Sequence, residues 1–347
     1  MNARLPQLDG IRGVAILLVV WWHYYNCGGN SGALATATNW TWAGVDLFFV
    51  LSGFLITGIL IDEAGATNLL SVFYRRRAAR ILPAYLLILV AACIRASIGT
   101  ASIVLPDWYH LTFTQNFIIG REGFGASLVP VTWSLAIEEQ FYLVWPMIVI
   151  LVKAPRIPGV CGCAIVVAIA FRAGTPGLSD FVGTFCRMDS LLFGALGAAL
   201  VRNKAGSVFL PRLRKWLVLI AGVTIVLGYR FQNQPQSGIF THTMFGIAGL
   251  GIVLASLDAG SLLARVLSFR GLRWMGKISY PLYLVHEFVR GIGSWWIELA
   301  VSIALAAVSH HTIEAFFLNL GKRAKYEHSA RDVEPIGPPK PAGAPPA

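Results

Sequence analysis

Two ionisable residues in the first apolar segment have the types and the spacing needed for proton transfer. Arg12 and His23 are eleven residues apart in a run that is otherwise almost entirely apolar. In an α-helix this separation is about three turns and about 16 Å of rise, so both side chains lie on nearly the same face. An ionisable side chain near the centre of a membrane span costs at least ~2.5–3.5 kcal/mol, which makes it a functional candidate. One helix could therefore present a cation near one membrane surface and a proton acceptor deep inside.

Carboxylates in two further apolar segments could act together with His23. Asp46 stands about one turn inside GVDLFFVLSGFLITGIL, at a depth similar to that of His23. A carboxylate beside an imidazole fixes its tautomer and stabilises the imidazolium, as general-base catalysis requires. Glu138 shares a helix face with Ser134 and Tyr142 through i, i+4 spacing, so we expect it to face an internal cavity.

Both carboxylates also have a structural interpretation. Asp46 could cap or anchor its helix at the membrane interface, and spacing alone does not separate this from a catalytic role. Glu138 could form an ion pair that holds two helices together, in a network with Arg187 and Asp189 of a later apolar run.

A basic run precedes the third apolar segment. The stretch FYRRRAARILPAY holds Arg75, Arg76, Arg77 and Arg80, with Arg76 and Arg80 one helical turn apart. Guanidinium groups bind phosphate oxygens in a bidentate manner, so this run could form a phosphate site. Taken alone, a basic run beside a membrane span more commonly sets topology or contacts anionic membrane lipids.

The composition shows what kind of protein positions these residues. Of 347 residues, 56% are hydrophobic and only 13% are charged, where a soluble domain carries about 25% charged residues. An ordinary water-soluble globule is therefore excluded. The net charge of +11 does not indicate nucleic acid, because the basic residues form short clusters between apolar runs.

The apolar runs predict an all-α, polytopic transmembrane bundle. A span needs roughly 20 mostly apolar residues, and ten such candidates occur. The expected spans are about 11–27, 43–61, 80–98, 133–152, 159–172, 181–201, 215–231, 238–257, 274–292 and 295–318.

Loop charges give the orientation, because cytoplasmic loops are rich in Lys and Arg. Twenty-two of the 28 basic residues fall at the N-terminus, in the even-numbered loops and in the C-terminal tail. We therefore expect both termini to be cytoplasmic and the protein to be a multi-pass protein of the cell inner (plasma) membrane. Residues 1–320 form the expected transmembrane domain, and the Pro-rich residues 321–347 a disordered cytoplasmic tail. The five cysteines lack the CxxC pairs of a zinc or redox site, and we expect no metal.

Taken in order, these segments resemble the integral-membrane acyltransferase family 3. The resemblance runs from LDGIRGVAILLVVWWHYY through the segments with Asp46, the arginine run and TWSLAIEEQFYLVWP to KISYPLYLVHEFV and SHHTIEAFF. Arg12 and His23 match the Arg-x10-His signature of the family. The arginines at 76, 77 and 80 match its RxxR-containing loop. Two departures occur: Glu287 and Phe288 follow His286 where a Trp-Pro pair is common, and the sequence ends without the appended SGNH esterase-like domain of some relatives. We therefore expect any further chemistry on the acceptor to lie elsewhere.

The resemblance implies a membrane O-acyltransferase with an acyl-CoA donor, acetyl-CoA or another short acyl-CoA, and ten spans. The donor phosphates are then expected on Arg12, Arg76, Arg77 and Arg80, with the pantetheine arm reaching up among the first four spans. His23, oriented by Asp46 or Glu138, would act as general base or carry the acyl group. The candidate oxyanion donors are Ser52, Asn116, Trp133 and Tyr142; Ser134 is a further candidate binding residue.

The acceptor is expected to be a glycan or a similar hydroxylated compound. The segment 99–131 contains Trp108, Tyr109, Asn116, Phe124 and four glycines, a mixture that suits a lid over a sugar or equally an interfacial aromatic belt. The main alternative function is a proton-coupled transporter or flippase of a glycan or anion, with Arg12, His23 and Glu138 as a relay. A structural or assembly protein is a third class, and no sequence feature indicates the oligomeric state.

Overall fold

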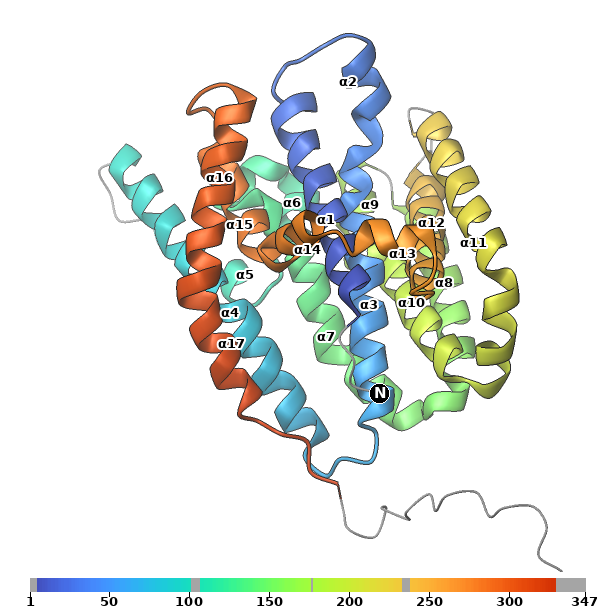
Figure 1. The fold of residues 1–347 in the computed structure, drawn as a ribbon. Helices are drawn as coiled ribbons and strands as arrows, with labels where there is room; N and C mark the ends of the chain where they lie inside the picture. The colour runs from blue at the N-terminus through green and yellow to red at the C-terminus, as the bar shows by residue number, and fades with distance from the viewer. Residues whose placement is uncertain (1–4, 101–106, 176, 233–237, 329–347) are drawn as a thin grey trace, which may run out of the picture.

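The computed structural model describes residues 5–100, 107–175, 177–232 and 238–328, and these residues are almost entirely helical (Figure 1). Within these ranges the backbone forms no strand beyond one isolated bridge between Ala66 and His328. The prediction of an all-α bundle is therefore confirmed.

Seven of the described helical segments are long and apolar enough to cross a membrane. They contain α3 (Gly44–Asp62), α4 (Leu69–Thr100), α7 (Trp133–Val152), α8 (Ile157–Gly174), α10 (Thr184–Arg202), α12 (Gly238–Ser256) and α16 (Trp295–Ser309), which continues through a π-helical turn at His310–Glu314 into α17 (Ala315–Lys322). A polytopic membrane bundle is consistent with these segments.

The other three expected spans have different forms. The first is α1 (Pro6–Trp21), which continues as a π-helical turn at Trp22–Asn26. The seventh lies inside α11 (Lys204–Phe231). The ninth, expected at 274–292, is divided into α14 (Arg270–Lys277) and α15 (Ser279–Val289). An apolar run alone does not distinguish one span from two buried helices. The total of ten spans and the cytoplasmic termini remain predictions.

Short helices connect the long ones. Figure 1 shows α13 (Leu262–Leu267) and α14 crossing the direction of the long helices in front of α1. The others are α2 (Ala33–Thr38), α5 (Trp108–Leu111), α6 (Gln115–Glu122) and α9 (Leu178–Val182). Helices α5 and α6 form within the segment 99–131, the predicted lid or interfacial aromatic belt, of which residues 101–106 lie outside the described residues.

Two glycines allow α3 and α10 to cross at close range. A Cβ on Gly53 would lie 1.8 Å from the backbone oxygen of Leu191, and a Cβ on Gly194 would lie 1.9 Å from that of Val50. Such close approach of two backbones is typical of membrane helix packing, in which small residues occupy the crossing point. This crossing fixes α3, which carries several site residues, against the α8, α10 and α12 side of the bundle.

Helix α4 shows how the arginine run is placed. The helix has 32 residues, about 48 Å, and so exceeds a hydrocarbon core of about 30 Å. Its middle exposes Leu86, Leu87, Val90 and Ile94 on one face, as a helix that faces lipid does. The arginines were expected in a loop before the span, but they lie in its helical first part. They therefore have fixed directions around the helix axis.

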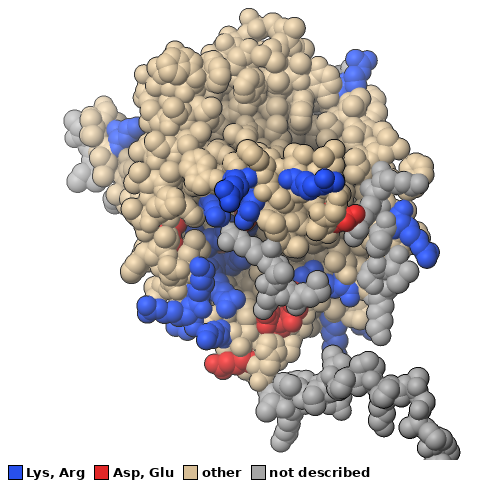
Figure 2. All heavy atoms as spheres, in the orientation of Figure 1, with Lys and Arg blue, Asp and Glu red and all other residues tan. Residues whose placement is uncertain are grey.

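The residues after α17 return to the start of α4. The backbone N–H of Thr67 donates to the oxygen of Glu327 at 2.8 Å, and the Asn68 side chain donates to that of Lys325 at 3.0 Å. Of the tail expected at 321–347, residues 321–328 thus pack on the bundle, and 329–347 lie outside the described residues. Figure 2 shows the face of the molecule that is seen in Figure 1. Lys and Arg gather in its middle and lower parts, while its upper part is mostly uncharged.

Candidate active site

Three cavities follow one another between α1, α3, α4, α7 and α15. We name them the basic entrance (about 650 Å³), the middle cavity (about 90 Å³) and the aromatic pocket (about 400 Å³). Arg12, Arg77 and Arg80 line both the basic entrance and the middle cavity. Val45 and Tyr283 line both the middle cavity and the aromatic pocket. The shared residues make the three cavities neighbours in a row: cationic side chains separate the first two, and the uncharged neck of Val45 and Tyr283 separates the second from the third.

The basic entrance gathers cations from four helices. Arg12 comes from α1, Arg77 and Arg80 from α4, Lys277 from α14 and Lys322 from α17. Arg77 and Arg80 are three residues apart, so they share one face of α4. This arrangement can bind a multiply charged anion such as a nucleotide phosphate.

Arg76 lies elsewhere, although the sequence grouped it with these arginines. Its Nε and Nη2 donate to the backbone oxygen of Ala324 at 3.0 and 2.7 Å, and its guanidinium lies 4.6 Å from the centroid of the Tyr326 ring. These contacts direct Arg76 to the C-terminal segment, whereas Arg77, about 100° around the helix axis, and Arg80 face the cavity.

Glu138 lies in the middle cavity together with Ser134 and Tyr142. Its Oε1 accepts a hydrogen bond from Ser52 at 2.9 Å, and its Oε2 accepts one from Tyr142 at 3.0 Å. The hydroxyl of Ser134 lies 2.6 Å from that of Tyr283 at the uncharged neck. The i, i+4 spacing of residues 134, 138 and 142 on α7 explains why one helix supplies three of the lining side chains.

His23 lines the aromatic pocket, which has Trp22, Trp42, Phe124, Trp133 and Phe181 among its walls. The π-helical turn that follows α1 carries His23 and closes with the bond from Cys27 N–H to the Trp22 oxygen at 2.9 Å. Single π-turns inside helices frequently occur at functional sites.

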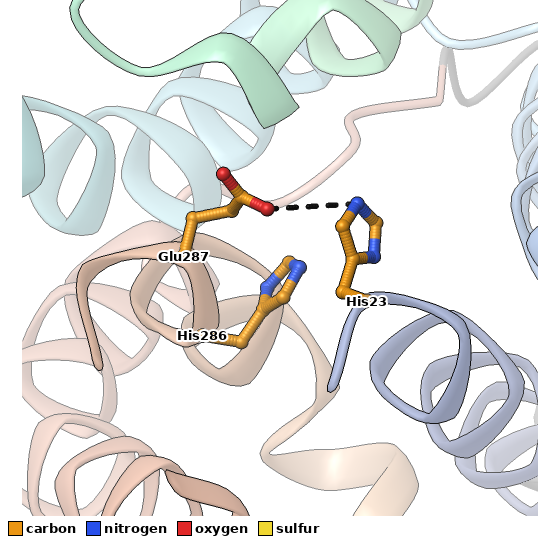
Figure 3. Close-up of side chains that lie close together, drawn as sticks. All are labelled: His23, His286 and Glu287. Atoms are coloured by element: carbon orange, nitrogen blue, oxygen red, sulfur yellow. Dashed lines mark ion pairs between the residues drawn. The ribbon is translucent and has the colours of Figure 1, made fainter. Parts of the chain in front are cut away.

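The ring of His23 has defined partners on both nitrogens. Its Nδ1 is 2.9 Å from the backbone oxygen of Val19, and its Nε2 is 3.7 Å from Oε1 of Glu287 (Figure 3). A carbonyl oxygen can only accept, so Nδ1 carries the hydrogen. In the neutral ring Nε2 therefore has the free lone pair, which a general base or a nucleophile requires.

Asp46 lies in a different cluster. Its Oδ1 accepts from Arg187 Nη2 at 2.9 Å and from Ser190 at 2.8 Å, and both charged side chains are fully buried. Arg187 also contacts His242 and lies 5.6 Å from the centroid of Trp133. The structure thus pairs Asp46 with Arg187, and Asp189 with Arg172 at 2.7 Å. Through Arg187, this network contacts Trp133, which lines the aromatic pocket.

Asn116, proposed from the sequence as an oxyanion donor, is a buried connector. Its amide donates to the Val182 oxygen at 3.1 Å and to Thr184 at 3.0 Å, and its oxygen accepts from Gln140 at 3.0 Å. These bonds tie α6 to α7 and to the start of α10. Asn116 is absent from the linings of the three cavities.

Several lining residues were not singled out as site candidates by the sequence analysis. They are Glu287 and Arg290 of the aromatic pocket, Tyr283 of the uncharged neck, and Lys277 and Lys322 of the basic entrance. The one available signal was the departure from the family pattern after His286. Nothing in the spacing connected residue 287 with residue 23.

Comparisons with known proteins address the family. A family model described as an acyltransferase domain matches residues 5–309. A peptidoglycan O-acetyltransferase of Listeria monocytogenes is 30% identical over 319 residues, 81% of this chain and 49% of that protein. A putative peptidoglycan O-acetyltransferase of Bacillus subtilis is 29% identical over 355 residues, 89% of this chain and 54% of that protein. A putative O-acetyltransferase of Staphylococcus aureus is 25% identical over 374 residues, with 92% and 58% covered.

The chain spans about half the length of these curated relatives. No solved structure matches it. The range matched by the family model includes every residue that lines the middle cavity and the aromatic pocket. The resemblance drawn from the motifs is thereby confirmed, and the chain belongs to the acyltransferase family 3.

Proposed function

We propose that the chain transfers an acetyl group, or another short acyl group, from cytoplasmic acyl-CoA to a hydroxyl of a glycan on the other side of the plasma membrane. The observation that carries this proposal is the row of three neighbouring cavities between a cluster of arginines and His23, whose Nδ1 faces the Val19 oxygen and whose Nε2 is left for proton transfer. The names of the relatives support a glycan acceptor, since two of them are described as peptidoglycan O-acetyltransferases.

The donor binds at the basic entrance. Its phosphates lie on Arg12, Arg77 and Arg80, and Lys277 and Lys322 add charge at the rim. Guanidinium groups suit this task because they remain charged and offer paired donors to phosphate oxygens. The pantetheine arm then passes through the middle cavity, where it meets Glu138, Ser134 and Tyr142.

The acceptor binds in the aromatic pocket. Its rings provide apolar surfaces for the C–H faces of a sugar, and its few charged groups lie close to His23. A cavity of about 400 Å³ suits one sugar unit of a longer glycan. Membrane lipids surround the bundle and take no part in the proposed reaction.

His23 acts as the general base. Its Nε2 takes the proton of the acceptor hydroxyl while the acceptor oxygen forms a bond to the thioester carbon. The carbon–sulfur bond then breaks, and the CoA thiolate receives the proton from His23. The products are the acylated acceptor and free CoA. If His23 instead carries the acyl group, the protein itself becomes labelled when it is incubated with acyl-CoA alone.

The test compares His23→Ala with the matched control His311→Ala, whose side chain is exposed on the π-turn before α17. Purified protein receives acetyl-CoA and a glycan acceptor, and free CoA and acylated glycan are measured. We expect His23→Ala to lose at least 100-fold in kcat, and His311→Ala to retain the activity. Undiminished transfer by His23→Ala would overturn the assignment. A wild-type protein that moves the glycan without releasing CoA would instead establish a transporter.

A further inference from the structure

Glu287 and His286 form a compact cluster with His23 that the proposed reaction has not yet used. Figure 3 shows the two rings and the carboxylate pointing toward one another, His23 from the π-helical turn after α1 and the other two from α15. One ligand-type atom from each residue lies within 4.8 Å of the others. The two imidazole centroids are 4.8 Å apart, with the rings inclined at 69°.

The hydrogen bonds of the cluster show which protons it holds. Nδ1 of His286 is 2.7 Å from the backbone oxygen of Tyr283, just as Nδ1 of His23 is 2.9 Å from that of Val19. Both Nδ1 atoms are therefore donors, and in the neutral rings both Nε2 atoms have free lone pairs. Nε2 of His286 is buried and has no hydrogen-bond partner among the residues that the structure describes. Two lone pairs and a carboxylate thus face one another.

Such a group of acceptors needs a proton, a hydroxyl donor or a cation among its members. A tetrahedral zinc ion with bonds of about 2.1 Å would hold its ligand atoms about 3.4 Å apart, close to the 3.7 Å between Nε2 of His23 and Oε1 of Glu287. A hydroxyl has a single proton, which it can donate to one of these acceptors, Nε2 of His23, with the side chains where they are. Under the proposed function the cluster therefore receives the acceptor hydroxyl and its proton, and a bound metal ion is an outcome of the test.

We propose that Glu287 is the positioning carboxylate of His23, the role that the sequence analysis gave to Asp46 or Glu138. This proposal rests on the proposed function. When Nε2 of His23 takes the proton of the acceptor hydroxyl, the positive charge forms on a ring whose Nε2 lies 3.7 Å from Oε1 of Glu287. The carboxylate of Glu287 stabilises the imidazolium until the proton passes to the CoA thiolate.

Arg290 keeps the carboxylate in place. Its Nη1 donates to Oε1 of Glu287 at 3.1 Å, one helical turn along the chain. The side chains of Glu287 and His23 are only 20% and 18% exposed, while that of Arg290 is 36% exposed. The carboxylate therefore acts on His23 from inside the pocket, and the arginine holds it from the rim. Asp46, in contrast, forms an ion pair with the buried Arg187.

The test replaces the carboxylate with its neutral isostere and then restores the charge. We expect Glu287→Gln to lower kcat about tenfold, the effect of one charge at this distance from a partly hydrated imidazolium. KM for acetyl-CoA stays within twofold, because the basic entrance is unchanged. Glu287→Asp recovers part of kcat. The matched control is Glu122→Gln, which removes an exposed carboxylate of α6 and leaves both constants unchanged.

Three results would overturn the proposal. Wild-type kcat in Glu287→Gln would show that the carboxylate has no part in the reaction. A rise in KM for acetyl-CoA equal to the loss in kcat, without rescue by Glu287→Asp, would indicate a structural role. Stoichiometric zinc in the purified protein that disappears in Glu287→Gln would show that the cluster binds a metal. If the wild-type protein releases no CoA at all, the proposed function fails, and that outcome is separate from these three.

Discussion

The three arginines that the sequence placed together at 76, 77 and 80 should differ sharply in their effect on donor binding. Arg80 and Arg77 line the basic entrance, whereas Arg76 is bound to the Ala324 oxygen and covers Tyr326. A hydrogen bond to a charged group contributes about 1.5–3 kcal/mol. The entrance is wide and hydrated, so we take the lower figure, which corresponds to about a tenfold change in affinity.

The assay measures kcat and KM for acetyl-CoA at a fixed acceptor concentration. Arg80→Gln and Arg77→Gln should each raise KM about tenfold with little change in kcat. Arg76→Gln serves as the matched control, since it removes the same charge from the same helix, and its KM should stay within twofold. The KM of the wild-type protein should also rise with ionic strength, because salt screens the phosphate contacts. Equal effects of Arg76→Gln and Arg80→Gln would refute the assignment of the basic entrance.

Two further changes test the row of cavities and the buried network. Val45→Phe narrows the neck shared by the middle cavity and the aromatic pocket. Acyl transfer should fall at least tenfold, while equilibrium binding of radiolabelled CoA stays within twofold. A parallel loss of CoA binding would place the donor elsewhere. Asp46→Asn leaves the buried Arg187 without its counter-ion, so the free energy of unfolding should fall by about 3–5 kcal/mol. The measurement is the thermal midpoint of unfolding in detergent, which should decrease. An unchanged midpoint with lost activity would instead indicate a catalytic role for Asp46.

The helices and part of the site could be predicted because both depend on local patterns. Apolar runs identified α3, α7, α8, α10 and α12 to within a few residues. The spacing of 134, 138 and 142 placed three side chains in one cavity for the same reason, since one helix carries them.

The partners of the charged residues could not be predicted, since they come from distant parts of the chain. Asp46 meets Arg187, 141 positions later, and His23 meets Glu287, 264 positions later. Periodicity carries no information on such pairs. Arg76 was grouped with Arg80 because the two stand one helical turn apart, but its guanidinium binds the oxygen of Ala324, 248 positions later, and local spacing does not reveal such a partner.

In the proposed reaction an acyl group passes from CoA on the cytoplasmic side, past His23, to a glycan on the other side. The most direct test uses sealed inside-out membrane vesicles that contain the protein and a glycan acceptor in their lumen. Radiolabelled acetyl-CoA is added outside, on the cytoplasmic face. We expect label in the luminal glycan with wild-type protein and none above background with His23→Ala at equal protein levels. Label that stays in CoA, or equal labelling of the glycan by both proteins, would contradict it.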